Sequence, residues 1–583
     1  MNPDILREIS TDLNDPEQIL RAIEASRPEQ EPCLSEGTPA RVLEEEALVE
    51  IWESVLHRDR IGVHDNFFDA GGTSLSAVQV LSRVSAIFLV DLPLRLIFER
   101  PTISGLAAAI YETRPGESSR SVFPALVAQE TVGARPASFA QEALWLAAEL
   151  DPASPAYGIA GALRLKGDVD VAAVEWAFNR VVKRHDSLRT RFDMVSGELI
   201  QIAEPIWQFR LDEEDVRGAG ESEWRRRAGE DAGKAFDLRQ LPLLRVRLFR
   251  TGFQEWVLSM VLHHIAADGW SFGVLESELG ALYQERTCGI AADLPKLKIQ
   301  YADYAQWQRD CFRRGLWDRQ LTWWTERLSH GASKLNLPRA STDALVRSGQ
   351  VQLDLGSELT IGVKAAARRL ACTLHMFLVA ALACVLYRIG GQDEITIGTP
   401  VAGRSQAATE GLIGLFANIL VVHVRLDGDP TFAELIRRVK EELLACHERQ
   451  DVPLEVLMKK VRASAGEGGV PFEILFALQN APMARFQPDG LEVSREGVRT
   501  GAPRLPLSIW AADSGGGIVF DSEFDRQIYD ASLVERILTT LRDLLKAVAT
   551  SESLRILDIP LDDGDGAFRT VLTDGDRASQ FRF

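Results

Sequence analysis

The chain has 583 residues, of which 46% are hydrophobic and 26% charged, and its formal net charge is −19. This length predicts several domains, and the composition is that of an ordinary globular protein. The acidic balance argues against a nucleic-acid partner, and no apolar run approaches the roughly 20 residues of a membrane-spanning helix.

Taken in chain order, residues 1–40 read as a linker or the remnant of an upstream segment, because their start lacks a secretory signal and their end is loose and polar. Residues 41–113 then change in pattern. Leu43, Ala47, Ile51 and Val55 recur at four-residue spacing, which predicts one apolar helix face. With the later stretches 74–88 and 92–112, this segment predicts a small four-helix bundle.

A polar segment at 114–121 is predicted to be a linker. Beyond it, helical and strand patterns alternate in two rounds, at 122–300 and 301–560, which predicts two α/β lobes. The Gly/Asp-rich residues 561–583 are predicted to be a second linker. The six cysteines are scattered and form no CxxC pair, which indicates reduced thiols in a cytoplasmic protein.

The first candidate site follows two glycines. In "DNFFDAGGTSLSAVQV", Gly71 and Gly72 interrupt the loop, and Ser74 stands at the mouth of the next helix. One reading is a helix N-cap, since serine there satisfies unpaired N–H groups. The other is an exposed attachment point, because the positive end of a helix favours a phosphate group.

Residues 41–112 resemble the peptidyl carrier domain of non-ribosomal peptide synthetases, whose signature is D-x-F-F-x-x-G-G-x-S-L. The matching residues are Asp65, Phe67, Phe68, Gly71, Gly72, Ser74 and Leu75. The resemblance implies that Ser74 carries 4'-phosphopantetheine, added by a phosphopantetheinyl transferase. Ala70 and Thr73 depart from the usual leucine and histidine or aspartate.

The second candidate site is "LHHIAADGWS", which follows a run that predicts a buried strand. Neighbouring side chains on a strand point to opposite faces, so His263 and His264 cannot easily share a metal, and no metal is expected. Asp268 and Gly269 are predicted to form the turn, and Ser271 to cap the following helix. A core histidine at a strand end stays open as the alternative.

Residues 122–560 resemble the condensation domain of the same synthetases. The motifs occur in the expected order: "SFAQEALWLAAELDPASPAYGI", "RHDSLRTRF", "LHHIAADGWS", "YADYAQWQ", "IGLFANILVVHVR", "HERQDVPLEVLMKKV" and "FEILFALQNAP". The resemblance implies two chloramphenicol-acetyltransferase-like lobes around a tunnel that admits a donor and an acceptor, each bound to a carrier.

The resemblance also implies roles for several residues. His264 lies where the acceptor amine attacks the donor thioester, either as a general base or as a group that positions the amine and stabilises the oxyanion. Asp268 organises the loop by pairing with Arg189 of the "LRT" segment, and Gly269 permits close backbone approach. His263 is expected to be structural.

Two residues are candidates for the tunnel: Trp270 for its wall and Asn418 for its polarity. A loop hydrogen-bonding role for Asn418 stays equally open.

The two histidines argue against a heterocyclisation domain. Epimerisation and a non-catalytic recruiting platform are the alternatives to peptide-bond formation. No adenylation loop or GxSxG elbow occurs, so the partners expected are an upstream adenylation or other synthetase domain and a downstream aminoacyl carrier. We expect a monomer that binds neither membrane nor nucleic acid, as a natural partial module or an excised piece.

Overall fold

The computed structural model describes residues 40–113, 123–129, 133–205, 207–328, 334–340, 347–465, 471–479, 486–498, 500–513 and 516–559. These residues form two compact units. The first contains the described residues up to Leu126 together with Arg404–Glu410, and the second contains the rest. Apart from Ala40, the segments predicted as linkers at 1–40, 114–121 and 561–583 lie outside the described residues.

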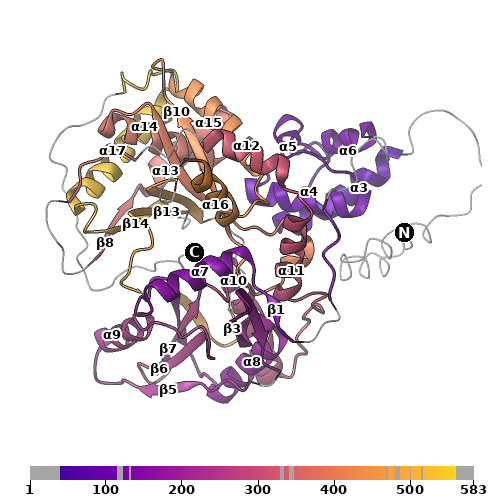
Figure 1. The fold of residues 1–583 in the computed structure, drawn as a ribbon, viewed down its shortest axis with the longest axis vertical. Coiled ribbons are helices and arrows are strands. Elements are labelled where there is room, and N and C mark those ends of the chain that lie inside the picture. Colours follow the sequence, from indigo (N-terminus) through magenta and orange to yellow (C-terminus); the bar gives the residue numbers. More distant parts are fainter. Residues whose placement is uncertain are drawn as a thin grey trace, which may run out of the picture. The chain divides into compact units, whose positions relative to one another are not determined.

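The first unit contains a bundle of helices joined by loops (Figure 1). Its helices are α3 (Ala40–Leu56), α4 (Ser74–Phe88), α5 (Arg95–Glu99) and α6 (Ile103–Glu112). The bundle has the four predicted helices, but α3 buries Leu48, Ile51, Trp52 and Val55, whereas Ala47 is only half-buried. The buried face thus follows the i, i+3, i+4, i+7 spacing of a helix instead of strict four-residue steps.

The second unit contains a five-stranded sheet in the order β12-β2-β7-β6-β5. These strands are β2 (Gly158–Lys166), β5 (Asp212–Asp215), β6 (Leu244–Arg250), β7 (Glu255–His263) and β12 (Glu492–Glu496). Alternate residues of β7 enter different cores: Leu258 and Met260 join one, and Val257 joins the other. Burial on both faces explains why the sequence of β7 is an almost continuous apolar run.

Helices cover both faces of this sheet. α8 (Val171–Arg184) and α10 (Gly269–Cys288) contribute to the larger core, and α9 (Glu221–Ala232) lies on the opposite face with Trp224 and Ala228 buried. A smaller sheet in the order β1-β4-β3 lies beside α7 (Phe139–Leu150). Its strands are β1 (Arg135–Pro136), β3 (Thr190–Val195), which follows the 3-10 helix η1 (Asp186–Arg189), and β4 (Glu198–Ala203).

The second lobe contains a six-stranded sheet in the order β10-β9-β11-β13-β14-β8. In Figure 1 its strands are coloured orange to yellow, except the redder β8. Its strands are β8 (Ser348–Asp354), β9 (Glu394–Val401), β10 (Asn418–Arg425), β11 (Ile474–Gln479), β13 (Leu507–Asp513) and β14 (Ile518–Asp525). Strand β11 is parallel to both β9 and β13, whereas the other pairs are antiparallel. The predicted two α/β lobes are therefore confirmed.

The remaining helices are α11 (Tyr301–Arg313), α12 (Asp318–Leu328), α13 (Gly356–Arg369), α14 (Leu374–Gly390), α15 (Phe432–His447), α16 (Leu454–Ala465) and α17 (Ala531–Thr550); a short 3-10 helix, η2 (Ala407–Thr409), belongs to the first unit. Helix α14 is the core helix of the second lobe, because every side chain from Met376 to Leu386 is buried. Among the described residues no single helix has the length and apolar character to cross a membrane, although the bent pair α13 and α14 meets those two criteria jointly.

One strand of the first sheet comes from far along the chain. After β11 the chain leaves the second sheet, β12 pairs antiparallel with β2, and the chain then returns as β13. The pairing is supported by Arg495 on β12, which donates to the buried Glu276 carboxylate of α10 at 2.7 Å. The sequence patterns did not predict this exchange of a strand between lobes.

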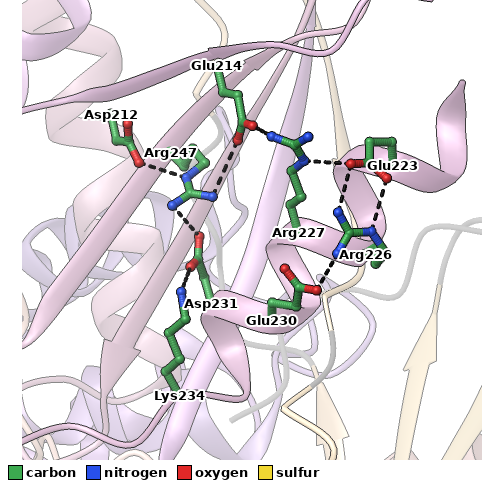
Figure 2. Close-up of polar contacts among 9 residues, drawn as sticks. All are labelled: Asp212, Glu214, Glu223, Arg226, Arg227, Glu230, Asp231, Lys234 and Arg247. Carbon is green, nitrogen blue, oxygen red and sulfur yellow. Dashed lines mark hydrogen bonds and ion pairs between the residues drawn. The ribbon is translucent and has the colours of Figure 1, made fainter. Parts of the chain in front are cut away.

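Figure 2 shows how α9, a helix with few apolar residues, is attached to the sheet edge. Arg247 of β6 contacts Asp212 at 2.8 Å, Glu214 at 3.4 Å and Asp231 at 3.3 Å. Arg227 of α9 joins Glu214 to Glu223. Surface ion pairs contribute to stability mainly when several charges form a network, as they do here, so this set helps to order the short edge strand β5.

Candidate active site

The carrier-type site is built at the start of α4. Thr73 is the N-cap: its Oγ1 accepts from Ser76 N at 3.2 Å, and Ser76 Oγ accepts from Thr73 N at 2.7 Å. The N-cap reading of Ser74 is therefore wrong, because the preceding threonine performs that role. Thr73, which departs from the family pattern, thus has a local structural function.

Ser74 occupies the first turn of α4 with a hydroxyl that no described group uses. Ser74 is half-buried, and its Oγ is shielded from solvent and has no hydrogen-bond partner among the described residues. The expectation of an exposed hydroxyl is therefore corrected. No acidic residue lies in the first turn of α4. An unpaired hydroxyl at the positive end of a helix fits a phosphodiester attachment.

The two glycines before Ser74 shape the approach to it. Gly71 has a φ of +97°, in the region that favours glycine. A Cβ on Gly72 would lie 2.3 Å from the Phe67 ring, which itself is fully buried against Trp52 with ring centroids 4.8 Å apart. The loop is therefore fixed by Phe67, and larger residues at 71 or 72 would move Ser74.

The second site lies where β7 ends. The backbone N–H of His264 donates to Tyr157 O at 2.8 Å, and Nδ1 of its half-buried imidazole lies 2.9 Å from Ala267 O. A carbonyl oxygen can only accept, so Nδ1 carries the proton, and the Nε2 lone pair of the neutral ring is left for another donor. Among the described residues Nε2 has no hydrogen-bond partner.

His263 points into the protein instead. It is 6% exposed, its Nδ1 accepts from Ile265 N at 3.1 Å, and its ring lies edge-on to Phe236 with centroids 5.6 Å apart. Burial, with nearby positive charge, lowers the pKa of His263 to about 3. These contacts support the structural role expected of His263.

The charge state of His264 follows from its neighbours. Burial lowers the pKa of His264, the positive charge of Arg504 lowers it further, and the Asp268 carboxylate opposes these effects only in part. The imidazole is consequently neutral at pH 7. No group of three or more His, Cys, Asp or Glu side chains within the described ranges could hold a metal ion.

Asp268 is the N-cap of α10, which begins at Gly269. Its Oδ1 accepts from Ser271 N at 2.9 Å and from Ser271 Oγ at 2.7 Å, so the predicted capping role of Ser271 is corrected: Ser271 completes a capping box, and Asp268 is the cap. Its Oδ2 accepts from the backbone N–H groups of Phe416 at 3.0 Å and Ala417 at 3.2 Å. Asp268 thereby joins the turn after His264 in the first lobe to a loop of the second.

That loop, Ile413–Ala417, has additional anchors in the first lobe and α11. Gly414 N donates to Ser271 Oγ at 3.1 Å, and the Tyr301 hydroxyl donates to Leu415 O at 2.6 Å. A Cβ on Gly414 would lie 2.1 Å from the Tyr301 ring, so glycine is required for this close approach. The two lobes are thus connected beside His264 by hydrogen bonds to backbone groups.

Asp268 and Arg189, both described in the structure, do not form the expected ion pair, so this prediction is wrong. Arg189 contacts the Asp186 carboxylate, and its Nη1 donates to Glu204 O at 2.6 Å. The reason is local: η1 places Asp186 one turn before Arg189, while both oxygens of Asp268 receive donors from Ser271 and the 413–417 loop.

Gly269 is buried at the first position of α10, and Trp270 beside it is half-buried. Asn418, at the start of β10, uses its whole amide for backbone contacts. Its Nδ2 donates to Gln450 O and Val452 O at 2.8 and 2.7 Å, and its Oδ1 accepts from Ile419 N and Leu454 N at 2.9 and 3.0 Å. These contacts favour the loop hydrogen-bonding role of Asn418 over the tunnel role.

Arg504 was missed by the sequence-based predictions. It lies between β12 and β13, and its Nε donates to Ala156 O at 2.7 Å, across 348 residues of sequence. No local pattern identifies such a partner, and an arginine before an apolar strand is unremarkable by itself.

Comparisons with known proteins agree with this architecture. The family model of the condensation domain matches residues 132–563, and that of the phosphopantetheine attachment site matches residues 46–110. One of the linear gramicidin synthase proteins of Brevibacillus parabrevis is 37% identical over 530 residues, which are 89% of this chain and 10% of that protein. The chain therefore spans about a tenth of the length of this curated relative.

Two solved structures are similar to about three quarters of this chain. The X-domain in its complex with OxyB from teicoplanin biosynthesis is 27% identical, with a TM-score of 0.67, over 76% of this chain and 99% of that chain. The first condensation domain of the CDA synthetase is 18% identical, with a TM-score of 0.63, over 74% of this chain and 100% of that chain, and this likeness concerns the fold alone.

Proposed function

Because this chain belongs to the condensation-domain family of non-ribosomal peptide synthetases, with a phosphopantetheine carrier domain before it, we propose that it transfers a donor acyl group from Ser74 to the amine of an acceptor. The observation that carries this proposal is the Nδ1 contact of His264 with Ala267 O, because it leaves the Nε2 lone pair available to an amine. The product is an amide bond.

Ser74 is the proposed attachment residue, since its hydroxyl has no other described partner and stands at the positive end of α4. When bound there, 4'-phosphopantetheine supplies the thiol that holds the donor acyl group as a thioester and that leaves when the amide forms. Gly71, Gly72 and the buried Phe67 keep the serine loop in one conformation.

His264 is proposed to accept a hydrogen bond from the attacking amine and then to take its proton. The lowered pKa of His264 keeps the ring neutral but makes it a weak base. A weak base is insufficient for an ammonium group of pKa about 8, so the acceptor amine enters unprotonated. Once the nitrogen has bonded to the carbonyl carbon its remaining protons are far more acidic, and Nε2 can take one.

The neighbouring residues are proposed to position this base. Asp268 holds the turn after His264 and the 413–417 loop together by accepting hydrogen bonds from Ser271 and from the amides of Phe416 and Ala417. Gly269 leaves space beside the imidazole for the amine, and Trp270 contributes to the wall of the site. Arg189 and Asn418 support the surrounding backbone through their own contacts.

The chain is proposed to work within a larger assembly. A phosphopantetheinyl transferase primes Ser74, an upstream adenylation or other synthetase domain loads it, and a downstream carrier presents the aminoacyl acceptor. Ser74 is proposed as the donor carrier because its domain precedes the condensation domain, and the chain is proposed to be monomeric.

A second candidate function is recruitment of another protein. It is favoured by the 27% identity to the X-domain, whose structure was solved as a complex with OxyB. In this case the second unit would bind a partner enzyme while Ser74 carries its substrate, and His264 would not be needed.

The test loads Ser74 with a peptidyl group, supplies an aminoacyl carrier in trans, and follows both carriers by intact-protein mass spectrometry. We expect the peptide to move to the second carrier with wild type and to stay on Ser74 with His264→Ala. The matched control, His423→Ala on β10, should transfer normally. Transfer by His264→Ala at the wild-type rate would refute the proposed role of His264, and absence of transfer with wild type would favour recruitment.

A further inference from the structure

Arg504 lies in the segment that carries the chain from β12 in the first lobe back to β13 in the second. Its guanidinium reaches the turn before β2. Nε donates to Ala156 O at 2.7 Å, and Nη2 donates to Gly158 O at 2.9 Å. Two contacts from one planar group fix both the position and the orientation of the turn.

The carbonyl between these two belongs to Tyr157, and it accepts the backbone N–H of His264 at 2.8 Å. The next residue, Gly158, pairs with His263 across β2 and β7. Arg504 therefore fixes the Ala156–Gly158 turn, and the same turn binds the backbone N–H of His264. A movement of this turn moves the His264 imidazole.

Charged and titratable groups from several elements surround the two histidines. Arg504 faces both of them, Asp268 at the start of α10 faces His264, and Arg245 of β6 faces His263. Arg504 lowers the pKa of His264 and Asp268 raises it, after the dominant effect of burial. The guanidinium of Arg504 is thus the nearby cation that favours the neutral ring.

We propose that Arg504 is a positioning residue for the transfer reaction, which places His264 by holding the two carbonyl groups on either side of Tyr157. It acts through the Ala156–Gly158 turn and does not touch the reacting atoms. The assignment deepens the proposed function, because it rests on the role given there to Nε2 of His264.

Two substitutions separate the geometry of Arg504 from its charge. Arg504→Lys keeps the charge but cannot hold two carbonyls in one plane, so kcat should fall roughly tenfold to a hundredfold while His264 still titrates low. Arg504→Gln removes the charge, so the imidazole of His264 should titrate about one pH unit higher, and the acidic limb of the kcat profile should move with it.

Arg245→Gln is the matched control. Arg245 holds a comparable turn through Asp231 O, Lys234 O and Ala235 O, but it faces His263 and not His264. This variant should leave kcat within twofold of wild type and the His264 titration unchanged. Histidine-labelled full-length chain, observed by NMR from pH 8 down to 4, reports the titration without any substrate, because this range reaches the His264 pKa of about 4.

The outcomes are distinct. The assignment is overturned if both Arg504 variants retain kcat within twofold, or if Arg245→Gln lowers kcat as much as Arg504→Lys does. An unshifted His264 titration in Arg504→Gln overturns the charge effect. Failure of the proposed function would appear elsewhere, as full transfer by His264→Ala, and would leave the NMR titration able to confirm the contact of Arg504 with the turn.

Discussion

Substituting Asp268 should destabilise the connection between the lobes more than the loss of an ordinary helix cap. Asp268 is 1% exposed, and its donors include Ser271 N, Ser271 Oγ, Phe416 N and Ala417 N. Asp268→Ala removes the acceptor of the three backbone N–H groups, whereas the Ser271 hydroxyl can still donate to Gly414 O at 3.0 Å. Each unsatisfied buried group costs about 1–3 kcal/mol, and partial relaxation reduces the sum, so we expect a loss of about 4–5 kcal/mol.

The chain offers a matched comparison in Asp170. It caps α8 with a single bond from Ala173 N at 2.9 Å and lies at the surface, so Asp170→Ala should cost about 1 kcal/mol. Urea unfolding of the full chain gives the two free-energy changes. Hydrogen exchange then locates the effect, because the amides of Phe416 and Ala417 should lose protection only in Asp268→Ala. Equal destabilisation by the two variants, with those amides still protected, would refute the anchoring role of Asp268.

Two further predictions concern buried charge. Burial lowers the pKa of His263 and His375 to about 3 and that of His447 to about 4. A histidine in the unfolded chain binds its proton near pH 6.5, so the folding stability is fully present above that pH and falls as the pH drops towards 4. At pH 5 the expected loss is about 2 kcal/mol per histidine. Urea midpoints at pH 7 and 5 test this, and His375→Gln, which cannot protonate, should flatten the decline. Arg495→Ala removes a cation from the 1%-exposed Glu276 and should cost about 3–5 kcal/mol, whereas the double variant Arg495→Ala/Glu276→Gln should cost clearly less. Equal losses in the single and double variants would argue that the pair does not fasten β12.

Elements and motifs formed by residues that are adjacent in the sequence could be predicted from it. The bundle helices, the strand that ends at His263 and the two α/β rounds follow from periodicity, and Ser74 and the histidine pair lie in short motifs. Even there the cap assignments shifted by a few residues, since Thr73 and Asp268 cap helices that Ser74 and Ser271 were candidates to cap. Several adjacent polar residues can each satisfy the same N–H groups, and only the backbone geometry selects one.

Long-range partners could not be predicted. Asp268 binds backbone amides 148 and 149 residues away, and backbone groups of any residue type can donate in this way. The expected partner, Arg189, instead forms an ion pair with Asp186, only three residues before it. Arg504 and β12 were missed for the same reason, because the pairing of distant segments leaves no periodic trace in either segment.

The exchange of β12 between the lobes also delays completion of the first sheet while the chain is being synthesised. Glu496 of β12 contacts Arg164 of β2 across 332 residues, so the first sheet stays incomplete until that much more chain has emerged. At about 5–20 residues per second, the ribosome takes roughly 15–70 s to supply the missing strand. Throughout this time β2 presents an unpaired edge, which is the kind of surface that chaperones must shield from other nascent chains. Slower translation over 166–492 should therefore lower the yield of folded chain, and early occupation of the β2 edge should restore it.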